Sequence, residues 1–182
     1  FALAYIIGFA ASVPVFVQLG SMWPELLAKT STVASPLLAT AVGCALVFKA
    51  SFGGAMLYGA RSWPQWLHAI VVGLLAIGST LTAACLMTLF AWMLNPVGTT
   101  FVDSFAQVES WHAIFLQPFN LWLLVQALAL SLFTAGFFLM GITAGKTLRR
   151  PADESERRVL AFALWLALGS GLVFLITLFG AS

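Results

Sequence analysis

The stretch His68–Leu94, HAIVVGLLAIGSTLTAACLMTLFAWML, decides the fold class, because it contains no Asp, Glu, Lys or Arg. A helix that crosses the hydrocarbon core of a bilayer needs about 20 mostly apolar residues, and this stretch is longer than that. Four other stretches have a similar character: Phe1–Gly20, Pro36–Gly59, Phe119–Gly145 and Val159–Gly180. The sequence therefore predicts an all-α, polytopic membrane helix bundle with five transmembrane helices, forming one domain over residues 1–182.

The composition excludes most soluble functions. Of the 182 residues, 62% are hydrophobic and 8% are charged, whereas an average soluble domain has about 25% charged residues. Eight Lys and Arg with six Asp and Glu are too few to cover a soluble surface, so soluble enzymes and nucleic-acid-binding proteins are excluded. Because the chain begins with Phe1, we expect a native N-terminal stretch to precede it.

The charges between the helices predict their orientation. Five of the eight Lys and Arg residues lie at 146–158, KTLRRPADESERR, whereas residues 95–118 contain Asp103 and Glu109 but no Lys or Arg. Because basic joints stay in the cytoplasm, we expect residues 146–158, the joint with Arg61 and the N-terminus inside, and residues 95–118, residues 23–35 and the C-terminus outside. Six tryptophans near the predicted helix ends fit an aromatic belt: Trp23, Trp63, Trp66, Trp92, Trp111 and Trp122.

Two local patterns concern packing. Residues 101–116, FVDSFAQVESWHAIFL, have apolar side chains at loose helical spacing, which fits either an interfacial amphipathic helix or a packed loop. Gly141 and Gly145 form a G-x-x-x-G pattern, and Ala50 with Gly54 forms a weaker one. Such patterns are typical of helix-packing surfaces in membranes.

Several kinds of site are excluded by position. Cys44 and Cys85 lie inside predicted spans, so we expect buried thiols rather than a disulfide framework or a zinc site. The string GITAGKT at 141–147 is not a Walker A loop, because Met140 stands where that loop needs its first glycine. The acids lie only between the spans, which excludes a buried Ser-His-Asp set. No catalytic residue and no metal site is predicted.

Lys49 is the sharpest anomaly, because it lies near the middle of Pro36–Gly59, about 18 Å along the helix from both Pro36 and Arg61. A lysine at such depth is costly, so it faces a bundle interior or a wet cavity and pairs with an anion. Since no predicted span contains Asp or Glu, its partner is water, a backbone carbonyl, an anionic group such as a haem propionate, or an acid of another subunit. A solvated or neutral lysine is the alternative interpretation.

Three other polar side chains are weaker candidates. Gln126 lies inside Phe119–Gly145, where an amide usually links helices. His68 begins its span beside Trp66, at a depth where an interfacial structural role is the simpler interpretation. His112 lies in the outer joint. Two histidines on opposite sides of a membrane cannot ligate one haem together.

The order of several motifs resembles subunit I of cytochrome bd-type quinol oxidases, from that family's second to its sixth transmembrane helix. Gln18–Trp23, QLGSMW, is similar to the family's QFGTNW, and Ala91–Pro96, AWMLNP, is similar to GWMQNP. Pro36-Leu37 followed by Lys49-Ala50-Ser51-Phe52 is similar to PLAIEG…ESTF, and Leu116-Gln117-Pro118 is similar to LNP. The resemblance covers nearly the whole chain and implies the same sidedness as the charges.

Departures from the family pattern lie where the family performs its chemistry. By this resemblance, Gln126 stands where the axial histidine of the low-spin haem is expected. The two acidic positions of the third helix fall at Thr40 or Ala41 and at Lys49, and a glutamate of the second helix is replaced by Phe16. The family's first helix with its haem-ligating histidine, its quinol loop and its later helices have no counterpart in this sequence. A carboxamide is a poor axial ligand, so we do not expect haem b on this chain, although a bound quinone is compatible with it.

The leading hypothesis is a non-catalytic, haem-poor scaffold subunit of a respiratory electron-transfer complex in a bacterial or archaeal inner membrane. Its partners are then other membrane subunits and a periplasmic electron-transfer protein, with Lys49, Trp111 and His112 as interface residues. The alternative hypothesis is a piece of an active haem-containing quinol-oxidising enzyme, in which Lys49 and Gln126 contact quinone or haem. A transporter lined by Lys49 ranks last, because no inverted repeat is visible.

Overall fold

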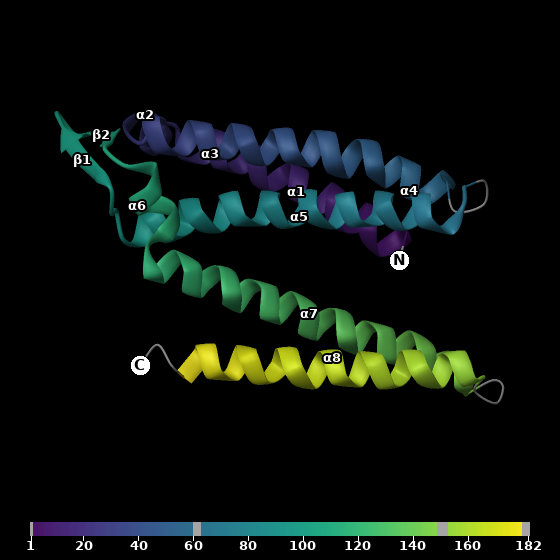
Figure 1. The fold of residues 1–182 in the computed structure, drawn as a ribbon. Helices are drawn as coiled ribbons and strands as arrows, with labels where there is room; N and C mark the ends of the chain where they lie inside the picture. Colours follow the sequence, from purple (N-terminus) through teal and green to yellow (C-terminus); the bar gives the residue numbers. More distant parts are fainter. Residues whose placement is uncertain (1, 60–62, 149–152, 180–182) are drawn as a thin grey trace. The chain divides into compact units, whose positions relative to one another are not determined.

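The computed structural model describes residues 2–59, 63–148 and 153–179, and they are mostly helical (Figure 1). The chain separates into two compact units, Phe1–Gln117 and Pro118–Ser182, each of which is described by itself. That residues 1–182 form one domain stays a prediction.

The first unit contains seven helices and two strands among its described residues: α1 (Ala2–Met22), α2 (Pro24–Lys29), α3 (Ser31–Cys44), a π-helix η1 (Ala45–Phe52), α4 (Gly53–Gly59), α5 (Gln65–Leu94), β1 (Thr99–Val102), β2 (Phe105–Val108) and α6 (Trp111–Leu116). The second unit contains α7 (Pro118–Thr147) and α8 (Glu154–Phe179).

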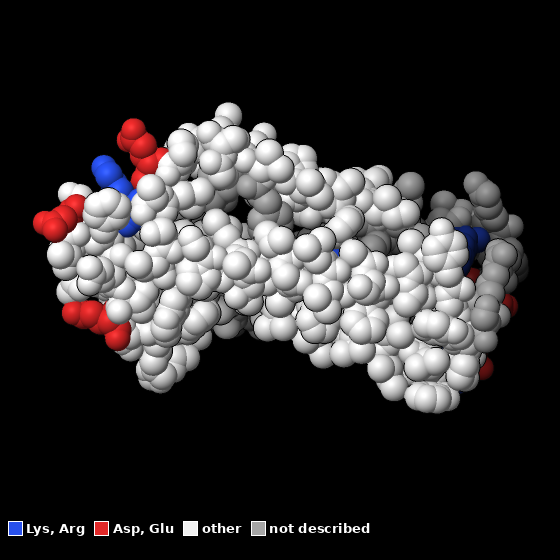
Figure 2. All heavy atoms as spheres, turned by 90° about the horizontal axis from the view of Figure 1, so that it is seen from above, with Lys and Arg blue, Asp and Glu red and all other residues white. Residues whose placement is uncertain are grey.

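Four helical stretches among the described residues are long and apolar enough to cross a membrane: Ser31–Gly59, Gln65–Leu94, Pro118–Thr147 and Glu154–Phe179. On the face that Figure 2 presents, charged side chains gather near the helix ends and the surface between them is almost entirely uncharged. The fold is therefore a helical membrane bundle. In α1, whose side chains the structure describes only from Ile6, the described apolar stretch is Ile6–Met22, and the count of five spans stays a prediction. The orientation of the spans also stays a prediction. It depends partly on three residues that lie outside the described ones: Arg61, Arg149 and Arg150.

The second predicted span begins earlier than its proline suggested. Pro36 lies inside α3, which starts at Ser31, and because proline has no N–H, the carbonyl that loses its helical donor is that of Thr32. A spanning helix tolerates an internal proline when neighbouring groups meet the freed backbone atoms. The same stretch continues without a break through η1 into α4. Extended π-helices are rare and occur frequently at functional sites.

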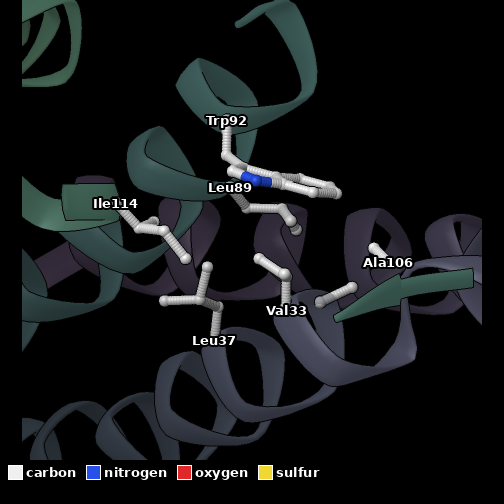
Figure 3. Close-up of a cluster of buried hydrophobic side chains, with 7 residues drawn as sticks. Val33, Leu37, Leu89, Trp92, Ala106 and Ile114 are labelled. Carbon is white, nitrogen blue, oxygen red and sulfur yellow. The ribbon is translucent and has the colours of Figure 1, made fainter. Parts of the chain in front are cut away.

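The core of the first unit lies where α3, α5, α6 and the strands meet (Figure 3). Val33 and Leu37 of α3 pack with Leu89 and Trp92 of α5 and with Ile114 of α6. The Trp92 indole N–H donates to the Thr99 hydroxyl at 3.3 Å, and the Thr32 hydroxyl donates to the Ala106 carbonyl at 2.6 Å. These bonds fix the strands to the ends of α3 and α5.

The segment that follows α5 is only partly helical. Strands β1 and β2 pair antiparallel, with Val102 opposite Phe105, and the two residues between them, Asp103 and Ser104, have φ values of +49° and +69°. Two consecutive positive φ values define the type I′ turn that two-residue hairpins favour. The interpretation of 101–116 as one amphipathic helix is therefore wrong for 101–108, and only α6 is helical.

The second unit is a pair of helices that lie side by side (Figure 1). A Cβ added at Gly136 of α7 would lie 2.9 Å from the Cβ of Ala167 and 3.0 Å from the Ala163 carbonyl oxygen, both in α8. The Trp122 indole N–H donates to the Thr177 carbonyl at 2.8 Å. Gly141 and Gly145 face open space within this unit, so α7 does not use its G-x-x-x-G pattern to pack on α8.

Candidate functional site

The backbone around Lys49 is held by a close contact between η1 and α5. A Cβ added at Gly78 of α5 would lie 2.0 Å from the Cβ and 2.3 Å from the Cγ of Phe48. Only a glycine at this position lets the two helices approach so closely. One turn further on, the rings of Phe48 and Phe52 lie 5.9 Å apart between centroids. The residue that precedes Lys49 is therefore locked in place.

Lys49 lies closer to one end of its span than the sequence predicted. The span begins at Ser31 and ends at Gly59, so at 1.5 Å per residue Lys49 is about 27 Å from the first and about 15 Å from the second. The side chain is half-buried. An ionisable side chain at such a depth is expected to serve a function unless it is solvated.

Gln126 belongs to the stripe of α7 that faces α8. In this stripe the Trp122 indole N–H donates a hydrogen bond to the Thr177 carbonyl of α8. Phe133 lies against Gly171 of α8, and Gly136 lies against Ala167. Gln126 lies four residues after Trp122 and is half-buried, and residues spaced by three or four share one face of a helix. By this spacing Gln126 lies on or beside the side of α7 that faces α8, and its role stays a prediction.

The two histidines lie near opposite ends of the first unit. His68 is in the first turn of α5, and His112 is in α6, whose Ile114 packs on Trp92 near the other end of α5. The 24 residues between His68 and Trp92 correspond to about 36 Å of helix. The pair cannot ligate one iron.

Trp111 and His112 are brought together at the start of α6, where both are exposed. The Ser110 hydroxyl caps this helix by accepting a hydrogen bond from the Ala113 amide at 3.3 Å. Lys49 is not part of this surface, because its neighbour Phe48 packs on Gly78, about 21 Å along α5 from Trp92. Gln126 belongs to the other unit. Within the first unit, Lys49 thus lies apart from Trp111 and His112, and the functional roles of all the predicted site residues stay predictions.

The His, Cys, Asp and Glu side chains of the described residues are scattered. No three His, Cys, Asp or Glu side chains gather among them to hold a metal ion, and Cys44 and Cys85 are free thiols within helices. The side chain of Phe16, a further departure from the family pattern, lies outside what the structure describes.

Sequence reasoning missed η1 and its contact with Gly78. The segment Ala45–Phe52, ALVFKASF, is apolar around its whole circumference apart from Lys49 and Ser51, so no periodicity reveals the wider turn. The two glycines inside α5, Gly73 and Gly78, were the available signals of a close helix approach, and only the second one makes it.

Taken together, four long apolar helices and a lysine within one of them define a polytopic helical membrane protein. The family of cytochrome bd terminal oxidase subunit I matches residues 1–180. The chain therefore belongs to the cytochrome bd terminal oxidase subunit I family.

Three relatives illustrate the similarity. The chain is 23% identical to cytochrome bd ubiquinol oxidase subunit 1 of Bacillus subtilis (strain 168) over 94% of this chain and 37% of that protein. It is 24% identical to cytochrome bd-II ubiquinol oxidase subunit 1 of Escherichia coli (strain K12) over 93% of this chain and 33% of that protein. A chain in the structure of bd oxidase from Geobacillus thermodenitrificans has the same fold, with a TM-score of 0.79, 21% identity, and coverage of 97% of this chain and 41% of that chain. The chain thus spans about a third of the curated relatives' length.

Proposed function

We propose that this chain is a membrane subunit of a respiratory quinol-oxidising complex, in which it acts as a structural scaffold without a b-type haem of its own. The observation that carries the proposal is the position of Gln126. By the resemblance to the family we expect an axial histidine there, whereas this chain has a carboxamide, on the stripe of α7 that faces α8 by its helical spacing. A carboxamide is a poor haem ligand and a common link between membrane helices.

The proposal includes a place in the cell and partners. The chain lies in a bacterial inner membrane as one bundle with five spans, its N-terminus in the cytoplasm and its C-terminus outside. Other membrane subunits cover its apolar helices, many of whose large side chains are exposed, such as Leu46, Phe137 and Trp165.

Lys49 serves in this proposal as an interface cation. Its ammonium group pairs with a carboxylate or a haem propionate of a partner subunit, which compensates the cost of a charge at that depth. The rigid seat formed by Phe48 on Gly78 supports this role, because a fixed backbone reduces the entropy lost when the charge pair forms. The exposed Trp111 and His112 dock a periplasmic electron-transfer protein.

The rival function is a piece of an active haem-containing quinol-oxidising enzyme. It is favoured by the length comparison, because the relatives continue well beyond the matched region and further segments can supply haem ligands. In that case Lys49 and Gln126 contact quinone or haem.

A spectroscopic experiment on the assembled complex separates the two functions. The complex is purified by a tag on this chain, and its reduced-minus-oxidised spectrum and haem content are compared among the wild type, Gln126→Ala and the control Val125→Ala, whose side chain is exposed. We expect all three to carry the same haem, and the tagged chain, once released from its partners in mild detergent, to carry none. Loss of one b-type haem in Gln126→Ala alone, or stoichiometric haem on the released chain, would overturn the scaffold function.

A further inference from the structure

Helices α7 and α8 of the second unit lie side by side (Figure 1) and leave a groove of about 540 Å³ along the pair. Its wall on α7 extends from Phe133 to Met140, its wall on α8 extends from Leu164 to Leu175, and every residue that lines it is apolar. The 11 residues from Leu164 to Leu175 correspond to about 17 Å of helix, which is roughly half the thickness of the hydrocarbon core of a bilayer. The groove therefore has the length of the acyl region of one leaflet.

An arginine continues the α8 wall of this groove beyond its end. Arg157 lies seven residues before Leu164 and eleven before Leu168, which at about 100° per residue places it within about 20° of both around the helix axis. Arg157 is exposed and lies about 10 Å along the axis from Leu164. It therefore stands on the face of α8 that lines the groove, at the end of the groove that is nearer to the start of the helix.

The charge of Arg157 is not compensated by the other described residues. Its neighbour Arg158 forms an ion pair with Glu154, whereas Arg157 makes no ion pair within the part of the chain that the structure describes. The Glu156 carboxylate accepts a hydrogen bond from the Asp153 amide at 3.2 Å, as in a capping box at the start of a helix. The groove thus combines an apolar floor with a cation at one end.

These dimensions and this charge match one phospholipid. The headgroup region adds about 5–8 Å on each side of the hydrocarbon core, so a phosphate at the level of Arg157 places the start of its acyl chain near Leu164. Residues 146–158 contain five Lys and Arg and three Asp and Glu, which favours a headgroup with a net negative charge. An arginine also matches the geometry of a phosphate group. We propose that the groove binds an acyl chain of an anionic phospholipid, whose phosphate pairs with Arg157.

The test uses a phosphatidylglycerol probe with a photoreactive diazirine in its acyl chain. The complex, purified by a tag on this chain, is placed in phosphatidylcholine nanodiscs that contain a minor fraction of this probe, or of the same probe with a phosphatidylethanolamine headgroup. After irradiation, the labelled residues of this chain are identified by mass spectrometry.

Two pairs of variants separate the headgroup from the acyl chain. Arg157→Gln removes the headgroup contact, and its control is Lys146→Gln, which removes the same charge from the last turn of α7. Leu168→Trp fills the groove, and its control is Leu132→Trp, an exposed leucine that lines a different groove of the same helix pair.

We expect the phosphatidylglycerol probe to label residues 133–140 and 164–175 of the wild type more strongly than the phosphatidylethanolamine probe does. Labelling falls about fivefold in Arg157→Gln, because one arginine near a membrane surface changes the affinity for anionic lipid by about this factor. It falls about tenfold in Leu168→Trp, because each methylene displaced from the groove changes the affinity roughly fourfold. Both control variants keep the labelling of the wild type.

Equal labelling by the two probes, unchanged labelling in Arg157→Gln or Leu168→Trp, or an equal loss in either control would overturn the proposal. Absence of label from the groove of the wild type would overturn it as well. In that case, a cross-link from a photoreactive residue at position 168 to a protein segment would identify a protein helix as the occupant.

Discussion

Phe48 lies directly on Gly78, so closely that a methyl group at position 78 would fall 2.0 Å from the Phe48 Cβ. This contact joins the π-helix to α5 and places Lys49 beside a fixed point of the bundle. Gly78 has no reactive side chain, yet its lack of a side chain determines where the backbone around Lys49 lies.

Gly78→Ala should destabilise the protein by about 1–3 kcal/mol or more, because the added methyl group forces η1 and α5 apart. The melting temperature of the detergent-solubilised complex measures this effect. Gly73→Ala is the control, since nothing lies within 4 Å of a Cβ at that position. Equal melting temperatures for the two variants would contradict the close contact.

Lys49→Met should weaken assembly with partner subunits, because it leaves the partner's anionic group buried without its cation. Blue native electrophoresis and the redox spectrum of the complex measure the loss. Lys146→Met, at the exposed end of α7, serves as the control. A Lys49→Met complex that assembles fully with an unchanged spectrum would remove the interface role.

Gly136→Leu should separate α7 from α8, because Ala167 and the Ala163 carbonyl occupy the space of its side chain. We expect a loss of about 2 kcal/mol or more in stability. Gly141→Leu, with open space around its Cβ, should preserve the helix pair. If it instead disrupts assembly of the complex while the pair remains intact, Gly141 packs on a partner.

Ser104→Gly should stabilise the hairpin by roughly 1 kcal/mol, because glycine adopts the positive φ of this turn without strain. Hydrogen exchange of the β1 and β2 amides should slow.

Ser110→Ala should destabilise α6 by about 1 kcal/mol, since it removes the side-chain cap on the Ala113 amide. Hydrogen exchange of the α6 amides should become faster. Unchanged exchange in both variants would contradict the turn and cap geometry.

The sequence was sufficient to predict most of the helical fold, since long uncharged runs permit few structures in a membrane. The predicted spans at 68–94, 119–145 and 159–180 each agree with a described helix to within about five residues. The error at Pro36 arose because a proline was treated as a start, although a packed spanning helix accepts it in the interior.

Details that depend on which residues meet in the folded chain were not predictable from the sequence. The hairpin at Thr99–Val108 depends on two residues, Asp103 and Ser104, that accept positive φ, and Phe and Val fit a strand as well as a helix. The choice of Gly136 over Gly141 for packing depends on where α8 presents Ala163 and Ala167. For the site, charge alone singled out Lys49, but the sequence did not show which of the two glycines of α5, Gly73 or Gly78, accepts a close neighbour.

The π-helix at Ala45–Phe52 also changes how the span tolerates a change in length. A π-helical turn holds more residues than an α-helical turn, so removal of one residue inside this segment allows it to return to α-helical geometry. Each residue of an α-helix advances the side-chain direction by about 100°. A one-residue deletion before position 45 would therefore rotate Lys49 relative to α3. A one-residue deletion within η1 would instead be compensated by the return of this segment to α-helical geometry. The π-helix is therefore where the span accommodates a shift in register.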